Sequence, residues 1–251
     1  MSGVRYQVSN GVAEITLDRP ERRNALNDEM VQELLARFRQ AQEDAAARVI
    51  VLRGVGDTFC AGADLKSGGV PAQPGEQPFA VLLRTMWNCP KPILGCVSGS
   101  AFGGGLGLIA ACDLTIGAAE AQFAFSEVRV GVVPAMISVV VIPKIGIQNA
   151  MWLFLTAERF SAERAREIGL LHRVCPRAEL DTAIANVLAE LRLAGPQALR
   201  HAKELVRRVP SMSMDEAFRY TSHLIGELFS SAEALEGMRA FQEKRKPSWA
   251  L

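Results

Sequence analysis

The first 185 residues alternate short apolar segments with segments of helical periodicity, and this alternation limits the chain to an α/β fold. RVIVLRG (48–54), KPILGCVSG (91–99) and DLTIGAA (113–119) are continuous apolar runs, which are typical of strands buried on both faces. Segments such as NDEMVQELLARFRQAQED (27–44) lie between them and place apolar residues at helical spacing, with Asn27 as the expected cap. Strands that alternate with helices predict a largely parallel sheet.

The two ends of the chain differ from this pattern. At the start, RYQVSN (5–10) and VAEITLD (12–18) flank Gly11 and predict a hairpin. After about Leu180 the strand-like segments stop, and only amphipathic helices are expected. We therefore predict an α/β core over residues 1–185 and a helical region over residues 186–251.

Charge and cysteine usage exclude several classes of function. The formal net charge is +1, so no bulk electrostatic signal indicates binding to nucleic acid or to a membrane surface. No segment reaches the 18 or so apolar residues of a spanning helix, and no secretory signal is visible. The five cysteines form no C-x-x-C pair, which indicates a reduced, cytoplasmic protein. The three histidines have no carboxylate or cysteine at ligand spacing, so no metal site is expected.

A cluster of glycines opens the apolar segment SGSAFGGGLGLIAACD (98–113). Three interpretations compete: a dinucleotide fingerprint at Gly105, Gly107 and Ala110, close packing of a helix on a strand, or an oxyanion site at a helix N-terminus. The oxyanion interpretation predicts a second donor loop, because such sites usually use two amides. DTFCAGADLK (57–66), which follows a buried strand, is the candidate.

FCAGADLK (59–66), SAFGGGLGLIAACD (100–113), FSEVRVGVVP (125–134) and LTAERFSAERAREIGLLHRV (155–174) resemble, in order and spacing, the crotonase family of enoyl-CoA hydratases and isomerases. The resemblance extends over nearly the whole chain. It implies a spiral of ββα repeats with a C-terminal helical region that forms trimers, often as a dimer of trimers. It also implies an acyl-CoA thioester substrate, with coenzyme A carried by that substrate and no separate cofactor.

The resemblance assigns roles to particular residues. The amides of Ala63 and Gly104 are expected to hold the thioester oxygen, and Asp64 is also expected to fix its loop through backbone hydrogen bonds. The positions expected to contact CoA are Arg22, Ala61, Ala63, Asp64, Leu65, Lys66, Gly104, Phe241 and Lys244. Two amides stabilise the enolate formed at C2, and the loss of one such donor typically costs about 3–4 kcal/mol of barrier.

The catalytic carboxylates decide which reaction is expected. Two-glutamate hydratases place one glutamate three residues beyond the middle glycine, where this chain has Gly107, and a second twenty residues later, where it has Glu127. Glu127 alone leaves hydration of a 2-enoyl-CoA and isomerisation of a 3-enoyl-CoA open. SEVRVGVVPAMIS (126–138) resembles hydratases of branched or carboxylated enoyl-CoA, so hydration is preferred. A non-catalytic acyl-CoA or partner-binding protein is the alternative of another class. The predicted pocket walls are Met86, Trp87, Val132, Met136 and Ile137.

Overall fold

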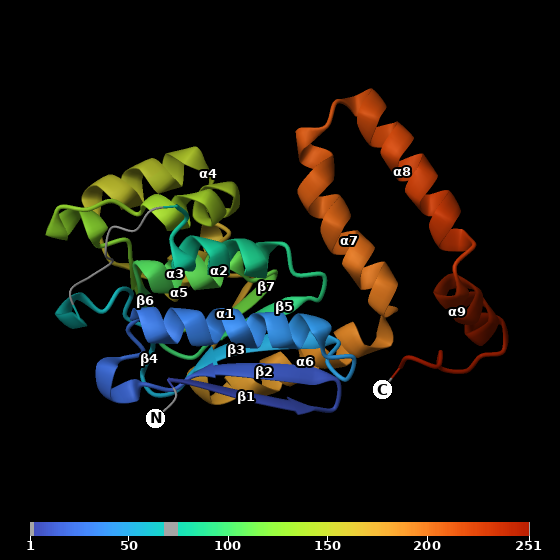
Figure 1. The fold of residues 1–251 in the computed structure, drawn as a ribbon, viewed down its shortest axis with the longest axis horizontal. Helices are drawn as coiled ribbons and strands as arrows, with labels where there is room; N and C mark the ends of the chain where they lie inside the picture. The colour runs from blue at the N-terminus through green and yellow to red at the C-terminus, as the bar shows by residue number, and fades with distance from the viewer. Residues whose placement is uncertain (1–2, 68–74, 251) are drawn as a thin grey trace.

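A six-stranded sheet forms the centre of the computed structural model, which describes residues 3–67 and 75–250 (Figure 1). The strands lie in the order β1-β2-β3-β5-β7-β10. The first two pair antiparallel, as the predicted hairpin requires, and every other neighbouring pair is parallel. Their bounds are β1 Val4–Ser9, β2 Val12–Leu17, β3 Val49–Gly54, β5 Ile93–Val97, β7 Leu114–Ala118 and β10 Arg173–Cys175.

A second, smaller sheet consists of four short strands in the order β4-β6-β8-β9. These strands are β4 Thr58–Cys60, β6 Ser100–Phe102, β8 Gln122–Ala124 and β9 Phe160–Ser161. Strands of two or three residues are too short for an alternating pattern to be read. β4 pairs parallel with β6, and β6 pairs parallel with β8. The three segments that follow these strands therefore begin side by side.

The first helix follows the predicted range 27–44 closely. The side-chain oxygen of Asn27 accepts a hydrogen bond from the amide of Met30 at 3.0 Å, which confirms Asn27 as the cap of the first helix. The helix bounds are α1 Asp28–Glu43, α2 Pro78–Trp87, α3 Gly104–Ala111, α4 Ala135–Thr156, α5 Ala162–Glu167, α6 Leu180–Leu193, α7 Pro196–Arg208, α8 Met214–Phe229 and α9 Ala232–Gln242. Short 3-10 turns cover η1 Pro20–Arg22, η2 Leu65–Ser67, η3 Glu127–Val130, η4 Arg177–Glu179 and η5 Val209–Ser211.

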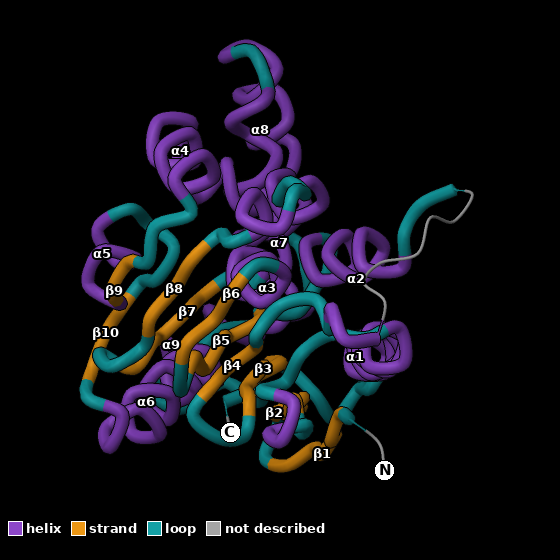
Figure 2. Tube along the Cα trace, turned by 90° about the vertical axis from the view of Figure 1, so that its left-hand side faces the viewer, coloured by secondary structure: helices purple, strands orange, loops and turns teal. Residues whose placement is uncertain are grey.

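Both faces of the large sheet are buried. On one face Ile50 and Leu52 of β3 belong to the main core, together with residues of α1, α2 and α3. On the other face Val51 packs in a smaller cluster with residues of α6. Figure 2 shows α3 and α6 on opposite sides of the strands. Consecutive apolar residues of β3 thus face different helices, which confirms the prediction drawn from the continuous apolar runs.

The long helix α4 is apolar over most of its 22 residues. Among the described residues it is the one helix whose length and composition would allow it to cross a membrane, and a third of that stretch is buried in the fold. The sequence prediction missed it because Pro143 interrupts the apolar run. The helix continues past this proline and kinks at Gly146, whose backbone is not helical (φ 76°, ψ 160°).

The C-terminal helices extend away from the sheet. Figure 1 shows α7 and α8 as the two arms of an inverted V on the right of the molecule, with α9 at the lower end of α8. Glu233 of α9 accepts hydrogen bonds from the amides of Gln197 and Ala198 at the start of α7. The boundary predicted at residue 185 falls inside α6, which packs on the sheet through Leu180 and Ile184. The division into a core and a helical region stays a prediction.

Candidate active site

The two predicted donor segments lie side by side in the structure. The segment 61–64 follows β4, and Gly103 and Gly104 follow β6, so the pairing of β4 with β6 brings them together. Gly62 has a φ of 85°, and a Cβ added to it would lie 2.8 Å from the carbonyl oxygen of Phe102 and 3.5 Å from the amide nitrogen of Gly104. This close approach between two loops requires glycine at position 62.

The amides of Ala63 and Gly104 are available to a ligand. Ala63 is exposed and Gly104 is half-buried. Within the described part of the chain, neither backbone N–H donates a hydrogen bond. Gly104 is also the first residue of α3, where backbone N–H groups have no partner within the helix and favour negative charge. The arrangement suits an oxyanion that accepts hydrogen bonds from both loops.

The segment 23–26 holds the loop of Ala63 in place through backbone hydrogen bonds. The Ala61 amide donates to the Arg23 carbonyl at 3.0 Å, the Leu26 amide donates to the Gly62 carbonyl at 2.7 Å, and the Asp64 amide donates to the Leu26 carbonyl at 2.8 Å. The buried carboxylate of Asp64 also forms an ion pair with Arg19 at 3.5 Å. The expectation that backbone hydrogen bonds of Asp64 fix this loop is confirmed.

Asn24 holds the segment 23–26 in place. Its side chain is fully buried, accepts a hydrogen bond from the Arg19 amide at 2.9 Å, and donates to the carbonyls of Val55 and Thr58 at 2.9 Å each. Its φ of 53° lies in the left-handed region, which asparagine tolerates better than most residues. The sequence analysis missed Asn24, although an Asn between two arginines and an apolar residue is a signal for a turn.

Glu127 lies beside the start of α3. It begins η3, which two residues separate from the end of β8, and a Cβ added to Gly103 would lie 3.2 Å from its Oε1 atom. The side chain is half-buried, and its Oε2 atom is buried with no hydrogen-bond partner. Burial raises the pKa of Glu127, since the charged form loses solvation, while its own backbone amide opposes the shift by a hydrogen bond. Glu127 is thus a carboxyl group suited to accept and release a proton next to the donor amides.

Two glycines of α3 allow close packing rather than a special backbone conformation. A Cβ on Gly105 would lie 2.6 Å from the Cys60 carbonyl oxygen, so the helix approaches β4 very closely there. A Cβ on Gly107 would overlap the Cγ2 atom of Ile137 and lie 3.7 Å from Leu83 Cδ1. Hydrocarbon therefore fills the space beside Gly107, where the resemblance places a first glutamate in other hydratases.

The side chains around Gly104 differ in part from the predicted pocket walls. Met86 is fully buried in the core, and Trp87 packs under the guanidinium of Arg207, 4.3 Å from the ring centre. These two residues lie on the end of α2 that points away from the glycines. The first turn of α2 contacts Gly104 through Phe79, whose Cζ atom would lie 3.4 Å from a Cβ on Gly104. Leu26, which precedes α1, would lie 3.3 Å from the same Cβ through its Cδ1 atom. The spacing of Phe79, Leu83 and Met86 places all three on one helix face, but the sequence does not show which end of that face meets the site.

The remaining predicted pocket residues lie at the start of α4 and in the segment before it. Val132 is exposed in the segment before α4, Met136 is half-buried at its first turn, and Ile137 is buried against Gly107.

The residues predicted to contact CoA fall into two groups. The first group is exposed and lies next to the segments 23–26 and 61–64: Arg22 ends η1, and Leu65 and Lys66 begin η2. Phe241 and Lys244 are exposed at the end of α9, on the far side of the molecule from β6 and α3 (Figure 1). A single chain therefore does not bring this second group to Glu127, and its role stays a prediction.

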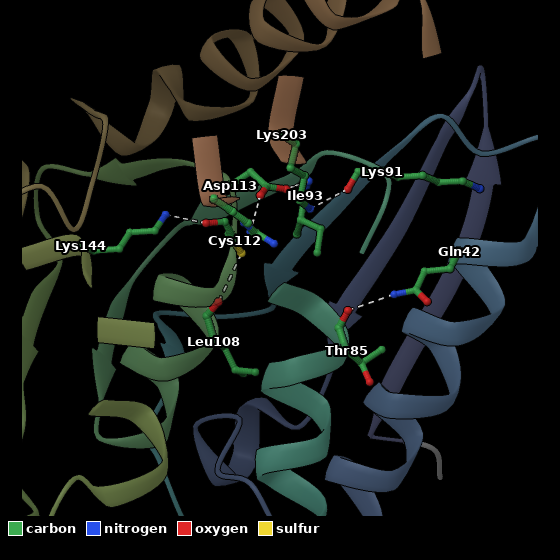
Figure 3. Close-up of polar contacts among 10 residues, drawn as sticks. Gln42, Thr85, Lys91, Ile93, Leu108, Cys112, Asp113, Lys144 and Lys203 are labelled. Carbon is green, nitrogen blue, oxygen red and sulfur yellow. Dashed lines mark hydrogen bonds and ion pairs between the residues drawn. The ribbon is translucent and has the colours of Figure 1, made fainter. Parts of the chain in front are cut away.

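A buried ionic network fixes the other end of α3, away from the donor amides (Figure 3). The carboxylate of Asp113 accepts hydrogen bonds from the Ile93 amide at 2.8 Å, from Lys203 at 2.6 Å and from Arg207 at 2.7 Å. Lys144 of α4 donates to the carbonyl of Cys112 at 2.6 Å. The network joins the end of α3 to β5, α4 and α7, so Asp113 has a structural role. Among residues 3–67 and 75–250, no group of His, Cys, Asp and Glu side chains could hold a metal ion.

Two converging loops with free amides beside a buried carboxyl group define the class of enzymes that stabilise an oxyanion while they move a proton. A model of the enoyl-CoA hydratase/isomerase family matches residues 7–250, so the chain belongs to this family. Its resemblance to crotonases is confirmed.

Individual relatives agree with the family. The carnitinyl-CoA dehydratase of Escherichia coli K12 is 35% identical over 265 residues, covering 99% of both chains. A Rhodobacter capsulatus protein named "Probable enoyl-CoA hydratase" is 35% identical over 249 residues, covering 97% of this chain and 96% of the relative. The crystal structure of an enoyl-CoA hydratase from Shewanella pealeana superposes with a TM-score of 0.92 at 32% identity, covering 98% of this chain and 96% of that one. The predicted crotonase fold is confirmed.

Proposed function

We propose that the protein adds water to a 2-enoyl-CoA thioester, or removes it in the reverse direction, with Glu127 as the single acid–base group. The observation that carries the proposal is the raised pKa of the Glu127 carboxyl group next to Gly103, whose neighbour Gly104 presents a free amide. Relatives named as hydratases and as a dehydratase support the same reaction.

In the proposed reaction the amides of Ala63 and Gly104 hold the thioester oxygen. Ionised Glu127 takes a proton from water as the water oxygen bonds to C3, and the double-bond electrons move toward C2 and the thioester oxygen. The resulting enolate is stabilised by the two amides. Glu127 then returns the proton to C2, which gives the 3-hydroxyacyl thioester and restores the carboxylate. The reaction consumes one water and needs no group beyond the coenzyme A of the substrate.

A second candidate reaction is the isomerisation of a 3-enoyl-CoA to a 2-enoyl-CoA. The hydrocarbon contact between Gly107 and Ile137 favours it, because one base that moves a proton from C4 to C2 needs no second carboxylate and no bound water. The oxyanion site would serve this reaction equally well.

The experiment that separates the two offers 2-enoyl-CoA and 3-enoyl-CoA in parallel to the wild type and to Glu127→Gln. If the protein is a hydratase, the wild type should decrease the 2-enoyl absorbance. Glu127→Gln should leave that absorbance unchanged. Glu158→Gln, an exposed carboxylate on the surface, is the matched control and should keep full activity. Appearance of the 2-enoyl absorbance from the 3-enoyl substrate alone would make isomerisation the function instead.

We further propose a homotrimer or a dimer of trimers located in the cytoplasm. Large apolar side chains on α8 and α9 are exposed in the single chain, which supports assembly through this region: Met214, Phe218, Ile225, Phe229, Leu235, Met238 and Phe241. The five free cysteines support a reducing compartment.

We also propose that the substrates are thioesters with branched or carboxylated acyl chains, as the resemblance of residues 126–138 implies. The CoA part of the substrate is proposed to lie along Ala61–Lys66 and Arg22.

A further inference from the structure

The second turn of α3 is closed to side chains. A Cβ on Gly107 would overlap Ile137 Cγ2 and would lie only 3.0 Å from Ile137 Cβ, a separation that real Cβ contacts rarely show. Ile137 and Leu83, the other neighbour of this position, are each 3% exposed, so neither can turn out into solvent. In a close-packed interior such an overlap must move a helix or force a strained rotamer.

Glu127 is the one proton-carrying group among the side chains that approach α3 at Gly103, Gly104 and Gly107. The added-Cβ position of Gly103 faces Glu127, that of Gly104 faces Leu26 and Phe79, and that of Gly107 faces Ile137 and Leu83. The first turn of α4, which carries Ile137, and the first half of α2 thus supply hydrocarbon on the side away from Glu127.

We propose that Ile137 is a specificity-determining residue, which confines proton transfer to Glu127 by filling the volume that any side chain at position 107 would need. This inference rests on the proposed function. Hydration requires one proton to leave water and one to reach C2, and a second carboxyl group would divide these two tasks. With Ile137 in place position 107 admits no carboxyl side chain, so Glu127 performs both tasks.

The steric part of the proposal is tested by unfolding temperatures. Gly226 lies in the interior of α8, and nothing is within 4 Å of the position of its added Cβ, so Gly226→Ala is the matched control. It should raise the melting temperature by about 2–4 °C, because alanine favours the helix. Gly107→Ala should instead lower the melting temperature in the wild-type background, and should lower it much less in Ile137→Ala, because that change removes the overlap with Cγ2 and keeps only the contact with the Cβ at position 137. A Gly107→Ala change that is equally destabilising in both backgrounds, or stabilising in both, would overturn the proposal.

The chemical part is tested by comparing Gly107→Glu/Ile137→Ala with Ile137→Ala alone. We expect the ratio of 2-enoyl hydration to 3-enoyl isomerisation to rise at least about tenfold in the double variant, in the range of one general acid–base group. Gly107→Glu alone should lose folded protein. If the double variant folds and its ratio is unchanged, or if Gly107→Glu alone gains as much, the proposal is wrong. Gly107→Asp/Ile137→Ala replaces the double variant if the longer side chain prevents folding.

The two tests also separate this inference from the proposed function. If the wild type and all variants turn over neither thioester, the proposed function fails. The stability comparison would still decide whether Ile137 excludes side chains from position 107. If the wild type is active and Ile137→Ala does not reduce the destabilisation caused by Gly107→Ala, the function stands and the inference about Ile137 falls.

Discussion

Replacing the buried amide of Asn24 with a carboxyl group tests how the loop of Ala63 is held. Asn24→Asp keeps the size of the side chain, its tolerance for a positive φ, and the oxygen that accepts from the Arg19 amide. It removes only the Nδ2 donor, which serves the carbonyls of Val55 and Thr58. Both carbonyls would then face a carboxylate oxygen in place of an N–H.

The expected loss of stability follows from these two carbonyls. A buried acceptor that loses its donor costs about 1–3 kcal/mol, so two of them should lower the free energy of unfolding by about 3 kcal/mol. For a chain of this length that corresponds to a fall of about 6–12 °C in melting temperature, measured by calorimetry. We also expect kcat to fall about tenfold or more, because the segment 23–26 that Asn24 anchors is hydrogen-bonded to Ala61, Gly62 and Asp64.

Asn10→Asp is the matched control. Asn10 has a similar φ of 48° but is exposed in the turn between β1 and β2. Its replacement should change the free energy of unfolding by less than about 0.5 kcal/mol. Equal melting temperatures for the Asn24 and Asn10 variants would refute the reasoning that Asn24 holds the loop by its side-chain hydrogen bonds.

Two further predictions concern ionisable groups. Burial raises the pKa of Glu127 in the folded state, so the stability tied to its protonation is complete below the unfolded pKa and is lost as the pH rises through the folded one. Glu127→Gln should therefore raise the melting temperature at about pH 8 and change it little at about pH 4, whereas Glu158→Gln should show no such trend. In the wild type, the pKa read from the acidic limb of the kcat/KM profile should lie above the usual pKa range of glutamate. Burial raises the pKa of Cys60 and of Cys112 to about 12, while Cys175 is only half-buried. Iodoacetamide should modify Cys175 in the native protein and all five cysteines only after unfolding, as read by mass spectrometry; rapid native modification of Cys60 would contradict its burial behind the donor loop.

The sequence predicted the first helix, three central strands and the two donor segments, but it missed α4, the longest helix. Apolar periodicity and the Asn27 cap located α1, and the continuous apolar runs located β3, β5 and β7, because these patterns depend on which faces of an element are buried. The pairing of the 61–64 loop with Gly104 was also predicted, on the chemical argument that an oxyanion needs two amides.

The pocket walls and the bracing contacts could not be predicted in this way. Met86 and Phe79 share one helix, but its direction relative to α3 decides that Phe79 meets Gly104 and that Met86 is buried in the core. The hydrogen bonds of Asn24 join segments 31 and 34 residues apart in the chain. No local pattern encodes such contacts, because they arise when separate elements pack.

The sequence by itself thus determined the α/β class, the family and the two kinds of group on which the proposed chemistry depends. These are the backbone amides of the glycine-containing loops and the carboxyl group of Glu127. These follow from local propensity and from motif spacing along the chain. The tertiary structure decided that the Glu127 carboxyl group is partly desolvated beside Gly103 and that Ile137 occupies the space next to Gly107. Desolvation and steric exclusion depend on which atoms of distant segments come into contact, and only the packed chain defines those contacts.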